Sequence, residues 1–390
     1  MNRRLFASLV VVLLAGPLHA QGERRLVAYF PEWGIHQRKY FVKDIPADKL
    51  THVNYAFAKI AGGVCVPRNE IDALGEPAGA GTLGQLQKLK EQHKHLKTLV
   101  SIGGWSLSGP FSDAALTPGS RQKFARSCVE FIMKHGFDGI DIDWEYPVTG
   151  GKDPTRARPE DKQNFTLLLQ ELRKELDARG KDDRARFLLT IAGPGGPDHY
   201  TNIELDKIAP HVDWINLIVY NYFGQTSKLT NFRAPLFASK NDPGQRKLHN
   251  VDATVNAYLK AGIPADKLVV GVSFIGRGWG EVKDVDNGLY QPHGPAPKGT
   301  WQPGEFDYRD LAANYVGKYK RFWHADAEAP WLFDAKSGIM ISYEDPESLR
   351  VKANYVNNKR LGGVMCWELS ADDAKHSLVS ALNKALREKK

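Results

Sequence analysis

Three carboxylic acids stand at alternate positions in a short segment that is otherwise apolar. In the run Asp138-Gly139-Ile140-Asp141-Ile142-Asp143-Trp144-Glu145, every second residue from Asp141 onward is acidic. Side chains alternate across a β-strand, so the three acids would share one face of a strand and the apolar residues the other. Burying three neighbouring carboxylates is unfavourable if all of them ionise, so at least one must hold a proton. A carboxyl group kept protonated near neutral pH beside ionised ones is suited to acid–base catalysis.

Three other interpretations of this segment compete with acid–base catalysis. A solvated acidic strand face is disfavoured because isoleucines alternate with the acids and indicate burial. A calcium loop needs turn residues and a glycine in mid-loop rather than β-branched residues. A magnesium site built on Asp141 and Asp143 remains an alternative. Paired catalytic carboxylates are the favoured interpretation, and we expect no metal.

The segment is one of eight strand-like runs, and amphipathic helical patterns such as 121–135 and 161–179 lie between them. The runs are Leu26–Phe30, Val53–Phe57, Thr98–Ile102, Gly139–Trp144, Phe187–Ala192, Trp214–Tyr220, Leu268–Phe274 and Gly363–Trp367. Strands that alternate with helices imply parallel pairing, and eight units close a (β/α)8 TIM barrel. A doubly wound open sheet is the second choice. In a barrel, the acids would lie toward the carboxyl ends of the strands, where barrel active sites are found.

The interval between the seventh and eighth runs is too long for one connecting loop and helix. It contains aromatic residues, a Pro303-Gly304 turn and a strand-like run, Gly338–Tyr343. We therefore expect a small α+β insertion over residues 280–345, and a catalytic barrel formed by 24–279 and 346–390.

The first twenty residues have the pattern of a signal peptide. Arg3 and Arg4 precede an apolar run, Leu5–Ala15, which is too short to span a bilayer, and Ala20 offers a small residue for cleavage. No later stretch reaches the length of a membrane span. We expect an exported protein, extracellular or periplasmic, that has no membrane attachment after cleavage and is a monomer.

Composition narrows the possible partners. The chain is 42% hydrophobic and 25% charged, which is a globular composition. Its net charge is +8, but basic and acidic residues interleave without a long basic block, so a nucleic-acid partner is not expected. Cys65, Cys128 and Cys366 are too few for a disulfide framework and allow at most one bridge.

The acidic segment matches the DxxDxDxE signature of glycoside hydrolase family 18, the chitinases and their relatives, and the resemblance covers nearly the whole chain after residue 20. Ser101-Ile102-Gly103-Gly104-Trp105 resembles the SxGG motif of the family's third strand. Residues 268–279 are similar to its seventh strand, and 362–367 to its eighth, which carries a tryptophan at the floor of the site. The long interval resembles the chitinase insertion domain.

The resemblance implies a substrate and a set of roles. The expected substrate is chitin or chito-oligosaccharides, cleaved at β-1,4 bonds between N-acetylglucosamine units with retention and without a cofactor, the substrate's acetamide being the nucleophile. Glu145 would be the proton donor, Asp143 would orient the acetamide, and Tyr220 would hydrogen-bond the acetamide. By the same resemblance, Asp141 would have Tyr29 and Ser101 nearby and would hold the proton that Asp143 exchanges. The implied substrate-binding residues are Trp367, Tyr29, Phe57, Ser101, Gly104, Trp105, Tyr146, Asn221 and Arg277.

One position departs from the family. Its sixth strand commonly ends in MxYD, whereas this chain reads Ile218-Val219-Tyr220-Asn221, so a neutral amide replaces an acid. Four tryptophans at strand ends also predict a sugar-binding cleft: Trp33, Trp105, Trp279 and Trp367.

Two other functions stay open: an endo-β-N-acetylglucosaminidase acting on N-glycans or peptidoglycan, and a non-catalytic chitin-binding lectin. Such lectins usually lack the terminal acid, which this chain has as Glu145.

Overall fold

Eight parallel strands close into a barrel in the structure, a computed structural model that describes residues 24–76 and 79–388. In pairing order the strands are β1 (Arg25–Pro31), β2 (His52–Ala61), β4 (Lys97–Gly103), β5 (Gly139–Asp143), β6 (Leu188–Pro194), β7 (Trp214–Ile218), β8 (Leu268–Ser273) and β14 (Gly363–Trp367). Because β14 pairs with β1, the circle is complete, which confirms the predicted TIM barrel and excludes the open sheet. The expected signal peptide lies outside the described residues.

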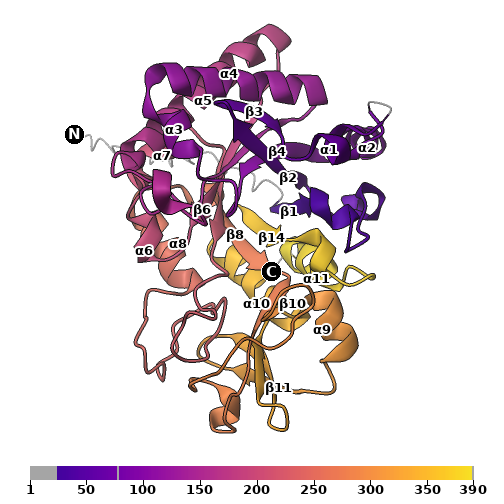
Figure 1. Cartoon of the computed structure of the whole chain (residues 1–390), viewed down its shortest axis with the longest axis vertical. Helices are drawn as coiled ribbons and strands as arrows, with labels where there is room; N and C mark the ends of the chain where they lie inside the picture. The colour runs from indigo at the N-terminus through magenta and orange to yellow at the C-terminus, as the bar shows by residue number, and fades with distance from the viewer. Residues whose placement is uncertain (1–23, 77–78, 389–390) are drawn as a thin grey trace, which may run out of the picture.

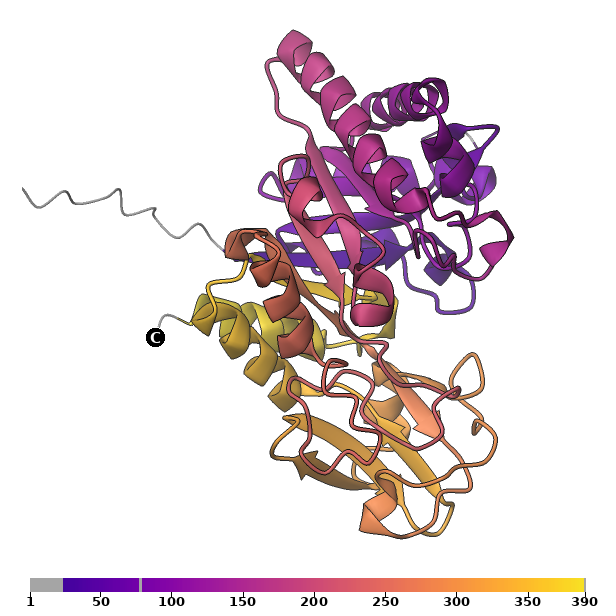
Figure 2. The ribbon, with the colours of Figure 1, turned by 90° about the vertical axis from the view of Figure 1, so that its left-hand side faces the viewer.

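Helices pack around the barrel, and the largest of them, α4 and α5, lie on the side away from β10 and β11 (Figures 1 and 2). The helices are α1 (Glu70–Leu74), α2 (Thr82–Gln92), α3 (Phe111–Leu116), α4 (Pro118–His135), α5 (Asp161–Asp183), α6 (Pro197–Tyr200), α7 (Leu205–Ile208), α8 (Val251–Lys260), α10 (Pro346–Asn358) and α11 (Ser377–Arg387). No helix among them is long and apolar enough to cross a membrane. The short strand β3 (Val64–Pro67) pairs antiparallel with β2.

Local sequence explains where α4 begins and ends. The Thr117 hydroxyl accepts a hydrogen bond from the Ser120 N–H, proline occupies the first helical position, and Gly136 ends the helix in the left-handed region. Helix α5 instead runs past Gly180, where the sequence pattern indicated its end. A Cβ on Gly180 would lie 2.4 Å from the Ala185 carbonyl oxygen, so this glycine permits the returning chain to approach closely.

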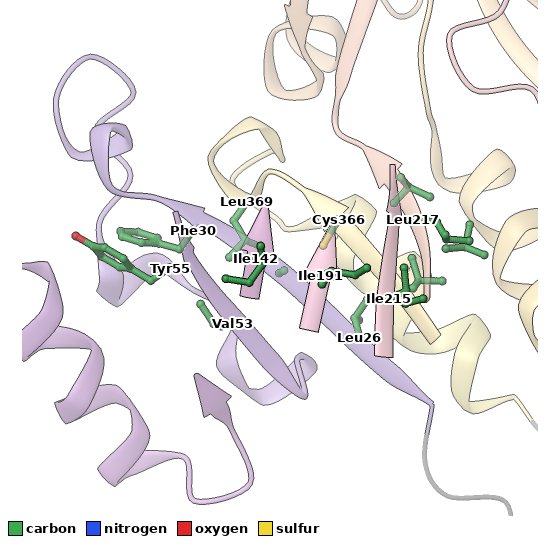
Figure 3. Packing of buried hydrophobic residues seen from close by; sticks show 14 of the residues in the cluster. Leu26, Phe30, Val53, Tyr55, Ile142, Ile191, Ile215, Leu217, Cys366 and Leu369 are labelled. Atoms are coloured by element: carbon green, nitrogen blue, oxygen red, sulfur yellow. The ribbon is translucent and has the colours of Figure 1, made fainter. Parts of the chain in front are cut away.

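Side-chain alternation separates two apolar layers. The outward side chains of β5, Ile140 and Ile142, belong to the large cluster between barrel and helices, and Figure 3 shows its members on β1, β2, β5, β6, β7 and β14. A smaller cluster fills the barrel, and it includes Leu99, Trp214 and Met365. The acidic side chains of β5 therefore face inward, as the sequence predicted.

A second, antiparallel sheet lies between the seventh and eighth barrel strands of the chain and below the barrel in Figures 1 and 2. It consists of β9 (Ile275–Trp279), β10 (Glu305–Asp307), β11 (Lys320–His324), β12 (Ala329–Asp334) and β13 (Ile339–Ser342), with α9 (Tyr308–Asn314) beside it. The sheet thus begins at Ile275, before the boundary expected at residue 280. It has a separate core that includes Trp279, Trp331 and Met340.

The three cysteines are buried and free. Cys128 lies on the inner face of α4 and Cys366 lies within β14.

Candidate active site

Asp141 sits in the middle of the inward face of β5, where it is fully buried and accepts four hydrogen bonds. The Tyr29 and Ser101 hydroxyls donate to Oδ2 at 2.7 and 2.8 Å. The Thr190 hydroxyl and the Asn216 amide donate to Oδ1 at 2.5 and 3.2 Å. Burial raises the pKa of Asp141, and these hydrogen bonds oppose the rise because they stabilise the charged form. Four donors around two carboxyl oxygens favour an ionised carboxylate.

Asp143 is buried two residues further along the same face. Burial, followed by the charges of Glu145 and Asp141, holds the pKa of Asp143 well above its usual range. Its Oδ1 atom is buried and has no hydrogen-bond partner among the described residues. An unpaired buried polar atom of this kind costs about 1–3 kcal/mol. The raised pKa of Asp143 favours its protonated form, and one of its oxygens is available to a bound molecule.

Glu145 follows the end of β5 and is partly exposed. Burial raises its pKa to about 7, against hydrogen bonds from the Tyr146 side chain and the Trp105 backbone, which lower it. A carboxyl group with this pKa can donate a proton and take it back near neutral pH. On β5 and just after it, burial thus raises the pKa of all three acids, but only at Asp141 do four hydrogen-bond donors oppose the rise.

Ser108 fixes the turn that carries Glu145. Its hydroxyl oxygen accepts the Glu145 N–H at 2.9 Å and lies 3.0 Å from the Asp143 carbonyl oxygen. The Gly104 N–H donates to the same carbonyl at 2.8 Å. Gly104 has a φ of +80°, and a Cβ there would lie 2.6 Å from the Phe57 ring. Both the backbone conformation and the space therefore require glycine at this motif position.

Aromatic rings gather around Trp367 at the end of β14. Tyr29 meets it edge-on at a centroid distance of 5.5 Å, Phe57 stacks on it at 5.8 Å, and Trp33 lies at 6.2 Å. Trp367 and Trp33 are only partly buried, so they offer apolar surface at the mouth of the barrel. Trp105, on the loop after β4, is 53% exposed.

The prediction that Trp279 belongs to this sugar-binding surface is wrong. Trp279 is fully buried in the core of the antiparallel sheet, and its indole N–H donates to the Gly224 carbonyl oxygen at 3.2 Å. The physical reason is topological, because β9 belongs to the second sheet rather than to the barrel.

The chain after β7 brings Tyr220 to the acids. Burial and then the charges of Glu145 and Asp143 raise the pKa of Tyr220 well above its usual range, which places its hydroxyl in their field. The next residue, Asn221, is exposed, and its Oδ1 accepts hydrogen bonds from Nε and Nη2 of Arg233 at 3.0 and 2.7 Å. Arg277, on β9, pairs with Glu305 at 3.0 Å rather than with any of the three acids.

Four residues of this site had no part in the sequence prediction: Thr190, Asn216, Ser108 and Arg233. Thr190 and Asn216 were detectable in principle, because each is a polar residue inside an apolar strand. Ser108 and Arg233 lie in loops, where a polar residue carries no such signal.

Comparison with known proteins gives a consistent picture. Residues 25–372 match the family described as "Glycosyl hydrolases family 18". The chain is 42% identical to Chitinase A1 of Niallia circulans over 395 residues, which cover 89% of this chain and 56% of that protein, so it spans just over half of that relative. It is 34% identical to Chitinase 1 of Aphanocladium album, over 92% of this chain and 84% of that one. The solved chitinase ChiA74 from Bacillus thuringiensis superposes with a TM-score of 0.89 at 37% identity, over 94% of this chain and 71% of the other.

Proposed function

The chain belongs to glycosyl hydrolase family 18, and from this premise we propose that it is a chitinase, which hydrolyses β-1,4 bonds between N-acetylglucosamine units. The observation that carries the proposal is the order of the acids on β5. Asp141 is held by four donors, Asp143 has a raised pKa and an unpartnered oxygen, and Glu145 has a pKa of about 7. The similar proteins named chitinases support the choice of substrate.

Glu145 acts as the acid and then as the base. Its proton passes to the glycosidic oxygen as the bond between that oxygen and the anomeric carbon breaks. In the second step, the Glu145 carboxylate takes a proton from the attacking water, so the residue ends as it began. A pKa near 7 suits both proton transfers, the donation to the glycosidic oxygen and the uptake from water.

The nucleophile is the acetamide carbonyl oxygen of the sugar itself, and Asp143 directs it. In this family the usual second carboxylate nucleophile is replaced by the substrate's acetamide. The free Oδ1 of Asp143 accepts the acetamide N–H, which turns the carbonyl oxygen toward the anomeric carbon. As positive charge develops on the cyclised acetamide, Asp143 ionises and its proton is shared with Asp141. Water then opens the ring at the anomeric carbon, and the configuration is retained.

The remaining residues position the sugar. Trp367 lies beneath the ring at the bond to be cleaved, supported by Tyr29 and Phe57. Tyr220 donates to the acetamide from the β7 side. The proposal needs no cofactor or metal. We also propose that the chain is exported after cleavage near Ala20, and that it acts as a monomer.

The test compares wild type with Glu145→Gln on N-acetyl chito-oligosaccharides. The variant keeps the shape of the side chain but has no proton to donate, so turnover should fall by about 10²–10⁴-fold while binding persists. The exposed Glu130, on α4, gives a matched Glu→Gln control that should keep full activity. Near-normal turnover in Glu145→Gln, or no cleavage of these oligomers by wild type, contradicts the proposal, and binding without cleavage by wild type indicates a lectin.

A further inference from the structure

His199 packs against the tyrosine that follows the proposed acid. The rings of His199 and Tyr146 stack with their centroids 4.3 Å apart and their planes inclined by 24°. They come from neighbouring strands of the barrel, because Tyr146 follows β5 and His199 belongs to α6, which follows β6. The Tyr146 hydroxyl donates a hydrogen bond to the Glu145 carboxyl group. The His199 ring therefore contacts the residue that hydrogen-bonds the acid.

Neighbouring groups on two sides hold His199 in place. Its Nδ1 atom lies 3.4 Å from the Thr149 hydroxyl, in the loop after β5. Oδ2 of the preceding residue, Asp198, lies 3.2 Å from Arg246 Nη2 and 3.0 Å from His249 Nε2, both in the long loop between β7 and α8. Burial lowers the pKa of His199, the Asp198 charge opposes this and His249 adds to it, so the imidazole is neutral near pH 7. Its contribution is therefore the place of its ring rather than a charge.

The Tyr146 hydroxyl is the movable donor on Glu145. Asp143 on β5 and Tyr220 after β7 lie close enough for the Glu145 charge to raise their pKa values. The groups that hydrogen-bond Glu145 are the Tyr146 side chain and the backbone of Trp105. A backbone N–H is placed by its loop, whereas a tyrosine hydroxyl is placed by two side-chain torsions and by whatever packs on the ring. Holding the Tyr146 ring therefore holds the hydrogen bond.

We propose that His199 is a positioning residue for the proton donor: its stacked ring keeps the Tyr146 hydroxyl on the Glu145 carboxyl group. The inference rests on the proposed function and deepens it, because it adds a residue from outside the acidic strand that sets the pH range of the acid. Without the stacked ring, Glu145 loses a hydrogen bond that stabilises its ionised form, and it keeps its proton to higher pH.

The experiment measures the pH dependence of kcat/KM on N-acetyl chito-oligosaccharides, whose alkaline limb reports the essential acid of the free enzyme. In Tyr146→Phe and in His199→Ala the limb should move upward by about one pH unit, the size expected when a carboxylate loses one hydrogen bond. His199→Phe keeps a flat ring and should keep the wild-type limb. His211→Ala is the matched control, because His211 directly precedes β7, at the end of the barrel away from the acids, and it should leave the limb unmoved.

The double variant Tyr146→Phe/His199→Ala tests whether His199 acts through the tyrosine. Once the Tyr146 hydroxyl is gone, removing the His199 ring should move the limb no further. Shifts that add in the double variant overturn the inference, as does an unmoved or lowered limb in either single variant. A shift in His199→Phe as large as that in His199→Ala overturns it as well. The position of the limb does not depend on how much of a variant is folded, so a reduced yield leaves the result readable.

Failure of the proposed function has a different signature. In that case the wild type does not cleave these oligomers, or Glu145→Gln cleaves them at a near-normal rate, whatever the substitutions at His199 do.

Discussion

Glu145→Gln should stabilise the folded protein at alkaline pH while it removes activity. The pKa of Glu145 rises from 4.5 to about 7 on folding, mainly because burial disfavours its charged form. Below pH 4.5 both the folded and the unfolded chain hold the proton. As the pH rises toward 7 the unfolded chain loses it first, so wild-type stability falls, and above 7 the loss is complete.

The size of the effect follows from the shift. A change of one pKa unit corresponds to about 1.4 kcal/mol, so the rise at Glu145 costs wild type up to about 3 kcal/mol at pH 8 and under about 1 kcal/mol at pH 5. Glutamine does not ionise and avoids this cost. The free energy of unfolding of Glu145→Gln should therefore exceed that of wild type by about 2–3 kcal/mol at pH 8 and only slightly at pH 5.

Urea unfolding of wild type and variant at the two pH values measures this difference. The exposed Glu130→Gln serves as control and should show no pH-dependent gain. An equal change at pH 5 and pH 8, or no gain at pH 8, would refute the reasoning that folding raises the pKa of Glu145.

Three further outcomes are expected. Trp367→Ala should lower both kcat and substrate affinity, because the distorted sugar loses its stacking surface and with it about 1 kcal/mol or more of stabilisation. A change in thermal stability alone would mark the ring as structural. Asn221→Asp should move the alkaline limb of kcat/KM to higher pH, because a new negative charge raises the pKa of the proton donor; a pH–rate profile that is unmoved or shifted downward contradicts this. Thr190→Val should lower kcat, because it removes a hydrogen bond that stabilises the ionised form of Asp141. A hydrogen bond to a charged group is worth about 1.5–3 kcal/mol. Thr98→Val is its control, because the buried Thr98 hydroxyl has no hydrogen-bond partner among the residues that the structure describes. Equal effects of the two variants on kcat contradict the role of Thr190.

The barrel was predictable because its strands are buried on both faces. A parallel strand that packs against helices on its outer face and against the barrel core on its inner face consists mostly of apolar residues. All eight strands could therefore be identified in the sequence as apolar runs. The acids on β5 were recognisable for the opposite reason, since polar residues alternate there with isoleucines.

Contacts made by closing the barrel could not be predicted from residue spacing alone; the family resemblance implied Tyr29 and Ser101 beside Asp141, but not Asn216. Asp141 receives donors from Tyr29, 112 residues earlier, and from Asn216, 75 residues later, and no local spacing encodes such pairs. Trp279 was misassigned because a tryptophan after an apolar run looks the same whether the next strand continues the barrel or starts a second sheet. The Asn221–Arg233 pair was likewise hidden, because Arg233 lies in an irregular loop.

The most direct test of the account is the configuration of the first product formed from an N-acetyl chito-oligosaccharide. Proton NMR during the first minutes of hydrolysis distinguishes the anomers of the new reducing end before they interconvert. Substrate-assisted catalysis by Glu145 and Asp143 predicts that the β-anomer forms first, and that cello-oligosaccharides, which lack the acetamide, are not cleaved. Initial formation of the α-anomer, or efficient cleavage of cello-oligosaccharides, would contradict it.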